Sequence, residues 1–556
     1  MTSRNKTSEN LNPRGKGGLF KGAKSSFSSA KYPLTIATFI LVAACSKAEI
    51  VKKPIVIPVE QQPKSDDVET SEAPAADQKS PPTIIPDAAT RANDLVDPSV
   101  ALFLDPPAPA AINTQTSQSI RTELAGKGIV PLLNSDYRTH LAAKVALGKM
   151  LFNDRILSGN MTVSCASCHV VWRGLGDGTS LMNDVGVKGL FSHIDHPTNE
   201  NFLPRNSPAI FNHGHKAFDK LFVDGRVEAA AGFPSGFKTP AGAALPEGLD
   251  SVLAAQALFP LLSREEMLGD KKDNGLAATF TTETAIWNAL MNRLRKNAEY
   301  MQMFRAAYPG VPDANFAIQH VGNAIAAFED QGFRADDSAF DKFMKGNDQA
   351  MTRTAVLGAQ IFYGRAQCST CHAGSLQSDQ KFHGISVPQF GIGKGHGVSK
   401  REDHGRFGVT GVEADRMKFR TPSLRNVYIS GPWGHDGAFT NLRDYVRHYV
   451  APVQNMATWN SSQVVLRAKA WPAGFFEPQL NLAMRKAVTD ANEFPGVQLS
   501  EQDIDWLVEF MGTLTDRSFL DRDVVAQRVP SGMVDYLGIY GLRSDWFEQL
   551  RPIPWL

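Results

Sequence analysis

Two short stretches of this 556-residue chain repeat one arrangement of reactive residues. Residues 165–169 read CASCH and residues 368–372 read CSTCH, so each pair of cysteines, two residues apart, is followed directly by a histidine. This is the pattern of covalent haem c attachment, in which both thiols bond to haem vinyl groups and the histidine is the proximal iron ligand. The pattern predicts two covalently bound haem c groups, held by Cys165, Cys168 and His169 and by Cys368, Cys371 and His372.

Other uses of paired cysteines fit this chain less well. A zinc ribbon places its pairs tens of residues apart, whereas here about two hundred residues separate them, and zinc does not require the trailing histidines. A redox dithiol lies in an alternating strand and helix context, of which the sequence has no sign. The fifth cysteine, Cys45, ends an apolar segment near the N-terminus, so no cysteine is left over.

The N-terminus has the features of an export signal. Basic residues precede PLTIATFILVAA, an apolar run of about twelve residues that suits a signal core and is too short to span a bilayer. The run ends at Cys45 and resembles a bacterial lipobox, in which the cysteine is lipidated; the alternative is an ordinary buried cysteine. Ser46 favours the outer membrane over the inner membrane. We expect an exported, periplasmic lipoprotein that meets the membrane only through its lipid anchor.

Composition and charge narrow the class of protein. Hydrophobic residues make up 42% of the chain, which is ordinary for a soluble globular protein. The net charge is +1, but the first 44 residues hold seven Lys/Arg and one Glu, which leaves about −5 on the remainder. This balance argues against a nucleic-acid partner and is compatible with a basic protein partner.

The elements that must position the two motifs are mainly helices. LGKMLF at 147–152 and LGAQIF at 357–362 each predict a helix with a close-packing glycine that leads into a haem motif. The sequence therefore predicts an all-α fold with two cytochrome c-like haem domains related by duplication. The expected segments are a lipoprotein signal peptide (1–45), a disordered Pro/Ala-rich tether (46–118), an N-terminal haem domain (119–345), a C-terminal haem domain (346–515) and a C-terminal extension (516–556).

Several longer motifs are similar to those of a known family. They are RNSPAIFN, LFVDGR, QALFPLLSREEM, QIFYGRAQCSTCH and FRTPSLRNVYISGPWGHDG, and they occur in this order between about 140 and 515. They resemble the bacterial dihaem cytochrome c peroxidase family, which includes MauG, the maturase of the tryptophan tryptophylquinone cofactor. The resemblance implies that the N-terminal haem is the peroxidatic site and that the C-terminal haem is six-coordinate and handles electrons.

The resemblance also implies roles for individual residues. Glu266 matches the family's acid–base glutamate and Gln256 a pocket glutamine; one carboxylate can take a proton from peroxide and give one to the leaving oxygen. Tyr449, fourteen residues after His435, matches the sixth ligand of the second haem, and His448 beside it is the alternative. Peroxidases of the family generally have methionine there and the MauG branch has tyrosine. A tyrosinate oxygen favours ferric iron, so we expect no need for reductive priming.

Two further sites are implied by the resemblance. Asn206, through its side chain, and Ser430 and Pro432, through their carbonyl groups, match the ligands of one calcium ion between the domains. The alternative is that these residues only shape a contact between the domains. Arg420, in FRTP, is expected to pair with a haem propionate, because a guanidinium group fits a carboxylate.

The chain departs from the family at two places. Val223, in LFVDGR, stands where the family has the tryptophan that lies between the haems, so either Trp172 or Phe222 replaces it or transfer is slower. His193 and His196 precede RNSP, where peroxidases of the family carry a histidine that plugs the distal site until reduction. Their spacing does not match, and an open five-coordinate first haem is the favoured interpretation.

Three functions are compatible with these residues. The leading one is a dihaem c peroxidase that reduces hydrogen peroxide to water at the N-terminal haem, with electrons relayed through the C-terminal haem from a small cytochrome or cupredoxin. A MauG-like oxidase that modifies a protein side chain through a high-valent haem is favoured by Tyr449 and weakened by Val223. A dihaem electron carrier would not need Glu266. The family is often dimeric, so a homodimer is compatible with the resemblance.

Overall fold

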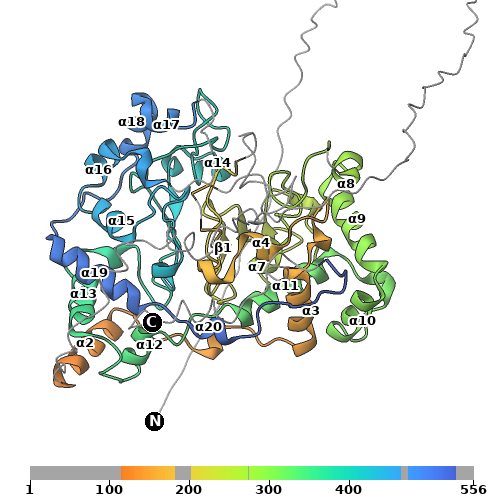
Figure 1. The fold of residues 1–556 in the computed structure, drawn as a ribbon, viewed down its shortest axis with the longest axis horizontal. Helices are drawn as coiled ribbons and strands as arrows, with labels where there is room; N and C mark the ends of the chain where they lie inside the picture. Colours follow the sequence, from red (N-terminus) through yellow and green to blue (C-terminus); the bar gives the residue numbers. More distant parts are fainter. Residues whose placement is uncertain (1–113, 179, 182–201, 273, 465–473, 534–556) are drawn as a thin grey trace, which may run out of the picture. The chain divides into compact units, whose positions relative to one another are not determined.

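Helices make up most of the regular structure (Figure 1). The computed structural model describes residues 114–533 except 179, 182–201, 273 and 465–473, all within one unit of the chain spanning 85–556. In these residues the strands form a three-stranded antiparallel sheet and a two-stranded pair: β1 (Lys220–Leu221), β2 (Val227–Ala229), β3 (Phe237–Lys238), β4 (Phe382–His383) and β5 (Phe419–Arg420). The prediction of a mainly helical fold is confirmed.

Some of the predicted features lie outside the described residues. These are the signal segment with Cys45, the tether up to residue 113, His193 and His196, and residues 534–556. Among the residues that are described, no helix combines the length and the apolar character that crossing a membrane requires.

The first hydrophobic core surrounds the CASCH motif. Its helices are α3 (Ala142–Asn153), α4 (Cys165–Cys168), α7 (Val252–Gln256), α9 (Glu283–Arg295), α10 (Ala298–Ala307) and α11 (Ile318–Gly332). The apolar side chains of α3 and α11 face each other, as their helical spacing predicts, and Leu147, Leu151, Val321 and Ile325 are almost completely buried. The short sheet β1–β2–β3 packs on the same core.

The second hydrophobic core surrounds the CSTCH motif. It is built from α12 (Ala339–Met344), α13 (Arg353–Tyr363), α15 (Leu442–His448) and α19 (Glu501–Thr513), with Cys368–Thr370 as a single 3₁₀ turn after α13. The hydroxyl of Thr352 accepts a hydrogen bond from the backbone N–H of Ala355 and begins α13, while Ser500 caps α19 in the same way.

A glycine brings the main helix pair of each core into direct backbone contact. A Cβ atom at Gly148 of α3 would lie 1.8 Å from the carbonyl oxygen of Ala324 in α11. A Cβ atom at Gly358 of α13 would lie 1.9 Å from the carbonyl oxygen of Trp506 in α19. Because no side chain fits in that space, both helix pairs depend on glycine at the crossing point.

The aromatic contacts beside these crossings are also equivalent. Phe152 packs on Phe328 with ring centroids 5.3 Å apart, and Phe362 packs on Phe510 at 5.2 Å. In both pairs the ring planes are inclined by 57°. The repeated frame supports an origin by duplication, which stays a prediction.

Each end of the described chain packs on the core that is more distant in sequence. Residues 114–118, assigned to the tether from the sequence, form the start of α2 (Thr114–Gly126), which buries Ile120 and Leu124 in the second core (Figure 1). In the extension, α20 (Ser518–Asp521) packs Phe519 against Phe211 of the first core, with ring centroids 4.9 Å apart. The domain boundaries expected at residues 119 and 515 therefore differ from the packing, in which α2 belongs with the second core and α20 with the first core.

A buried carboxylate holds the extension on the first core. Asp154, at the end of α3, accepts hydrogen bonds from the Ser531 hydroxyl (2.6 Å) and from the Tyr300 hydroxyl (2.7 Å). It also caps the turn that follows α3 through the backbone N–H of Ile156 (2.9 Å). Residues 516–533 are thus an integral part of the first core.

Candidate functional site

In the second haem motif, one ring nitrogen of the histidine is already engaged in a hydrogen bond. Nδ1 of His372 lies 3.0 Å from the carbonyl oxygen of Gln377, five residues further along the chain. Burial lowers the pKa of His372, so the imidazole is neutral. A neutral imidazole that donates from Nδ1 leaves Nε2 free for a metal, which is the usual arrangement of a ligating histidine.

Buried polar contacts hold the loop that follows His372. The guanidinium group of Arg425 donates from Nη1 to Asp341 (2.6 Å) and from Nε and Nη2 to the carbonyl oxygen of Ser375 (2.9 and 2.7 Å). Both charged side chains of this pair are completely buried. The hydroxyl of Tyr363 donates to the side chain of Gln377 (2.7 Å), so the acceptor of the His372 hydrogen bond is itself positioned.

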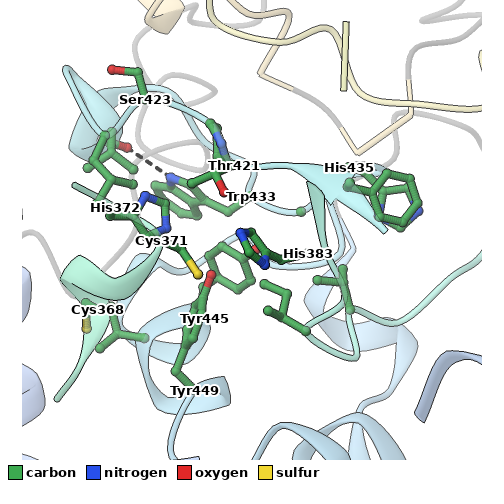
Figure 2. A pocket seen from close by; sticks show the side chains of 18 of the residues that line it. Cys368, Cys371, His372, His383, Thr421, Ser423, Trp433, His435, Tyr445 and Tyr449 are labelled. Atoms are coloured by element: carbon green, nitrogen blue, oxygen red, sulfur yellow. Dashed lines mark hydrogen bonds between the residues drawn. The ribbon is translucent and has the colours of Figure 1, made fainter. Parts of the chain in front are cut away.

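A largely apolar cavity opens in front of His372, and Tyr449 lines it. Figure 2 shows Tyr445 and Tyr449 entering this cavity below Cys371. The neighbouring His448 does not line it, because its Nε2 lies 2.9 Å from the carbonyl oxygen of Ile385. Successive helical residues point about 100° apart, which separates the two candidates. The geometry therefore favours Tyr449 over His448 as the residue that faces a cofactor.

Tyr445 is a neighbour of Tyr449 that sequence analysis did not identify. Tyr445 lies on α15 and Tyr449, four residues later, directly follows its last residue with helical backbone angles, so the two point to the same side. Their ring centroids are 5.6 Å apart. Burial and this neighbour hold the pKa of Tyr449 well above its ordinary value. The four-residue spacing of the two tyrosines in the sequence could have identified Tyr445 as a neighbour of Tyr449.

The first haem motif repeats the histidine geometry of the second. Nδ1 of His169 lies 2.9 Å from the carbonyl oxygen of Leu175, and burial lowers its pKa. Cys165 and Cys168 pack against the first core at the two ends of α4. This imidazole is therefore also neutral and presents Nε2 as a ligand.

Gln256 and Glu266 lie in one compact turn next to this motif. α7 ends at Gln256, whose carbonyl oxygen accepts a hydrogen bond from Phe259 (3.1 Å). The backbone N–H of Gly159, in the segment that leads to α4, donates to the carbonyl oxygen of Met267 (2.8 Å). The structure thus brings the predicted distal residues to the core that carries the first haem motif.

Glu266 has the electrostatic surroundings of an acid–base group. Its side chain is half-buried, and this burial raises its pKa above the ordinary value for a glutamate. The positive charges of Arg226 and Lys394 oppose the rise. A raised pKa makes this carboxyl group a better proton donor than an exposed glutamate, while its carboxylate form can still accept a proton.

The surroundings of Arg420 show whether this residue could pair with a haem carboxylate. Its guanidinium group is buried, and Nε donates to the carbonyl oxygen of Phe222 (3.2 Å). Nη1 has no hydrogen-bond partner among the described residues, and burial lowers the pKa of Arg420 to about 10. A buried cation of this kind is costly unless an anion pairs with it, so the residue fits a haem propionate.

Val223 lines the same cavity as Arg420, where the family has its tryptophan. Phe222 does not line this cavity: its ring packs under the guanidinium group of Arg226 (3.4 Å) and beside Phe259 (6.5 Å between centroids). The side chain of Trp172 lies outside the described residues.

The predicted calcium ligands lie together at the boundary between the two cores. Nδ2 of Asn206 donates to the carbonyl oxygen of Pro432 (2.8 Å), and Ser430 lines the same cavity. Oδ1 of Asn206 is buried and has no partner among the described residues. Nowhere in the described part of the chain do three or more His, Cys, Asp or Glu residues gather to hold a metal, so a cation here would depend on amide and carbonyl oxygens.

Comparisons with known proteins agree on one family. Residues 142–349 match the sequence model of the family described as di-haem cytochrome c peroxidase. Cytochrome-c peroxidase IdrP2 of Pseudomonas sp. (strain SCT) is 28% identical over 330 residues, which are 55% of this chain and 73% of that protein. Methylamine utilization protein MauG of Methylorubrum extorquens is 29% identical over 308 residues, which are 55% of this chain and 68% of that protein.

A solved structure of a MauG-like protein associated with microbial copper homeostasis aligns with a TM-score of 0.47 and 25% identity, over 72% of this chain and 96% of that chain. Taken with the family match, the sequence relatives confirm the predicted resemblance to the dihaem cytochrome c peroxidase and MauG family. Members of this family are oxidoreductases, and the family implies two c-type haems. The paired cysteines, the neutral histidines and the unpaired guanidinium nitrogen of Arg420 fit such groups.

Proposed function

We propose that this chain is a dihaem c peroxidase that reduces hydrogen peroxide to water at the N-terminal site and receives electrons through the C-terminal site. The observation that supports this most directly is Glu266, a half-buried carboxyl group with a raised pKa, whose neighbour Met267 packs in the core that carries the first haem motif. An electron carrier has no use for such a group. The electron donor would be a small cytochrome or cupredoxin.

In this proposal the chain supplies proton transfer and positioning. A haem at the N-terminal site would supply the iron that binds peroxide and delivers electrons to it. The Glu266 carboxylate accepts the proton that peroxide loses on binding and returns it to the departing oxygen, while Gln256 orients the peroxide by hydrogen bonding. Two electrons and two protons convert one peroxide into two molecules of water. At the C-terminal site His372 and Tyr449 would be the residues that bind the iron.

The proposal is tested by mixing the oxidised protein, loaded with both haems, with peroxide and a reduced small cytochrome. We expect two donors to be oxidised for each peroxide, without prior reduction of the protein, because an anionic Tyr449 ligand favours ferric iron. Stopped-flow absorption measures the reaction of the protein with peroxide and the oxidation of the donor. If the protein exchanges electrons with the donor and leaves peroxide unchanged, it is an electron carrier and the proposal is wrong.

A MauG-like oxidation of a protein side chain is the second candidate, and the position of Tyr449 in the cavity favours it. The same stopped-flow experiment separates the two functions. An oxidised product that persists when no donor is present, and that is slow to take electrons from the cytochrome, would favour side-chain oxidation.

We also propose that one calcium ion binds at Asn206, Ser430 and Pro432. Removal of this calcium with a chelator is expected to weaken the contact between the two cores, because the buried Oδ1 of Asn206 would lose its partner. We expect a lower melting temperature and slower transfer between the haems, both restored by added calcium but not by magnesium, which prefers a smaller octahedral site. Metal analysis that finds no calcium in the purified protein would contradict this.

A further inference from the structure

One segment, residues 206–213, forms a wall that the two haem sites share. It is clamped at both ends. Arg205, just before it, donates to Asp403 through two nitrogens (2.6 and 2.9 Å) and to Asp224 (2.6 Å). At the other end, the side chain of Asn212 exchanges hydrogen bonds with the backbone of Ala335 (2.8 and 3.1 Å). The shared wall is therefore fixed at one end by Asp403 and Asp224 and at the other end by Ala335 of the first core.

The shared wall contacts both sites at once. Ser207 approaches the turn that follows the first haem motif, because a Cβ atom at Gly176 would lie 3.1 Å from its carbonyl oxygen. The backbone of Pro208 also acts on the pKa of His169, the histidine of that motif. Pro208, Ala209, Phe211 and His213 also line the cavity in front of the second haem motif. The two sites are thus separated there by a single thickness of chain.

His213 is a buried polar side chain in this wall. It is only 8% exposed, and its ring packs edge-on against Phe218 (5.3 Å between centroids). Nδ1 is buried and has no hydrogen-bond partner among the described residues. Burial, with further effects of Arg420 and His169, lowers the pKa of His213 to about 3, so it is neutral.

His213 and Arg420 therefore present two buried, unpartnered nitrogen atoms on the lining of one cavity, which Val223 also lines. A buried polar group without a partner costs free energy, so such groups persist where a ligand satisfies them. The ligand chemistry that fits both a guanidinium and an imidazole nitrogen is a carboxylate, such as a propionate of the second haem. A hydrogen bond from His213 would connect that carboxylate to the wall that touches His169.

We propose that the shared wall carries electrons between the two haem sites, with His213 in place of the tryptophan that Val223 replaces. This rests on the proposed peroxidase function, in which two reduced donor proteins each lose one electron for every peroxide converted to two waters. The electrons cross from the C-terminal to the N-terminal site one at a time, and no bond of His213 is made or broken. The hydrogen-bonded contact takes the place of an aromatic ring between the sites.

The test measures transfer between the sites without peroxide, in the full protein loaded with both haems. A photochemically reduced flavin adds one electron, and absorption follows its equilibration between the haems. His213→Phe keeps a ring against Phe218 and removes the polar nitrogen. We expect equilibration to slow about tenfold, and the difference between the two reduction potentials to change. His213→Gln, which restores a polar group, is expected to recover part of the rate.

His215→Phe is the matched control. His215 lies two residues further on, packs edge-on against Tyr137 and does not line the cavity, so wild-type kinetics are expected. Wild-type equilibration with unchanged potentials in His213→Phe would overturn the proposal. So would a His213→Gln variant as slow as His213→Phe, because the polar group would then not matter. Since no peroxide is present, either result is distinct from a failure of the peroxidase activity.

Discussion

Replacing Glu266 by glutamine is expected to lower peroxide turnover by about 100- to 10,000-fold while both haems remain attached. Glutamine has nearly the same size and cannot exchange a proton, so the change removes the acid–base group and little else. Steady-state oxidation of a reduced cytochrome by peroxide measures the loss, and mass spectrometry of the intact chain verifies haem attachment.

The pH dependence of the same reaction provides a second measurement. Burial raises the pKa of Glu266, so the carboxylate that accepts the first proton is lost as the pH falls through this raised value. The wild-type rate should therefore decline on the acid side at a higher pH than an exposed carboxyl group would produce. The residual activity of Glu266→Gln should lack this decline.

Glu265→Gln is the matched control, because its side chain is exposed and one residue away. It removes the same charge from the same turn, and we expect nearly wild-type turnover. Equal losses in the two variants would mean that the charge of the turn matters and that Glu266 is not the acid–base group. Full activity of Glu266→Gln would exclude it outright.

Gly358→Ala is expected to destabilise the protein by about 3 kcal/mol. The new Cβ atom would lie 1.9 Å from the carbonyl oxygen of Trp506, so α13 and α19 must separate. Because α13 leads directly into the CSTCH motif, the C-terminal haem should also become less completely attached. Denaturant unfolding and the haem content of the purified protein measure the two effects.

Gly275→Ala is the control for this change. Gly275 begins the short helix α8 (Gly275–Thr279), and a Cβ atom there would meet nothing within 4 Å. Alanine at such a helical position is expected to be neutral or to stabilise by up to about 1 kcal/mol. If Gly358→Ala unfolds at the same denaturant concentration as the wild type, the close helix contact is not needed for stability.

Much of the fold and of the candidate site could be predicted because it depends on short spacings. The Cys-x-x-Cys-His motifs and the glycines of LGKMLF and LGAQIF act within one or two helical turns. Gln256 and Glu266 are ten residues apart, and the segment between them is held by backbone hydrogen bonds that span only a few residues. The sequence could not distinguish Tyr449 from His448 as the residue that faces a cofactor. In the structure Tyr449 lines the cavity, whereas His448 forms a hydrogen bond with the carbonyl oxygen of Ile385.

The sequence alone determined which residues can attach haem and which helices lead to them. Tertiary structure alone decided that α2 packs on the second core, that residues 519–531 pack on the first, and that His213 and Arg420 line one cavity. The physical reason is that bonding and helical geometry are set within a few residues. Burial of apolar surface is non-directional, so many pairings of distant segments satisfy it equally well.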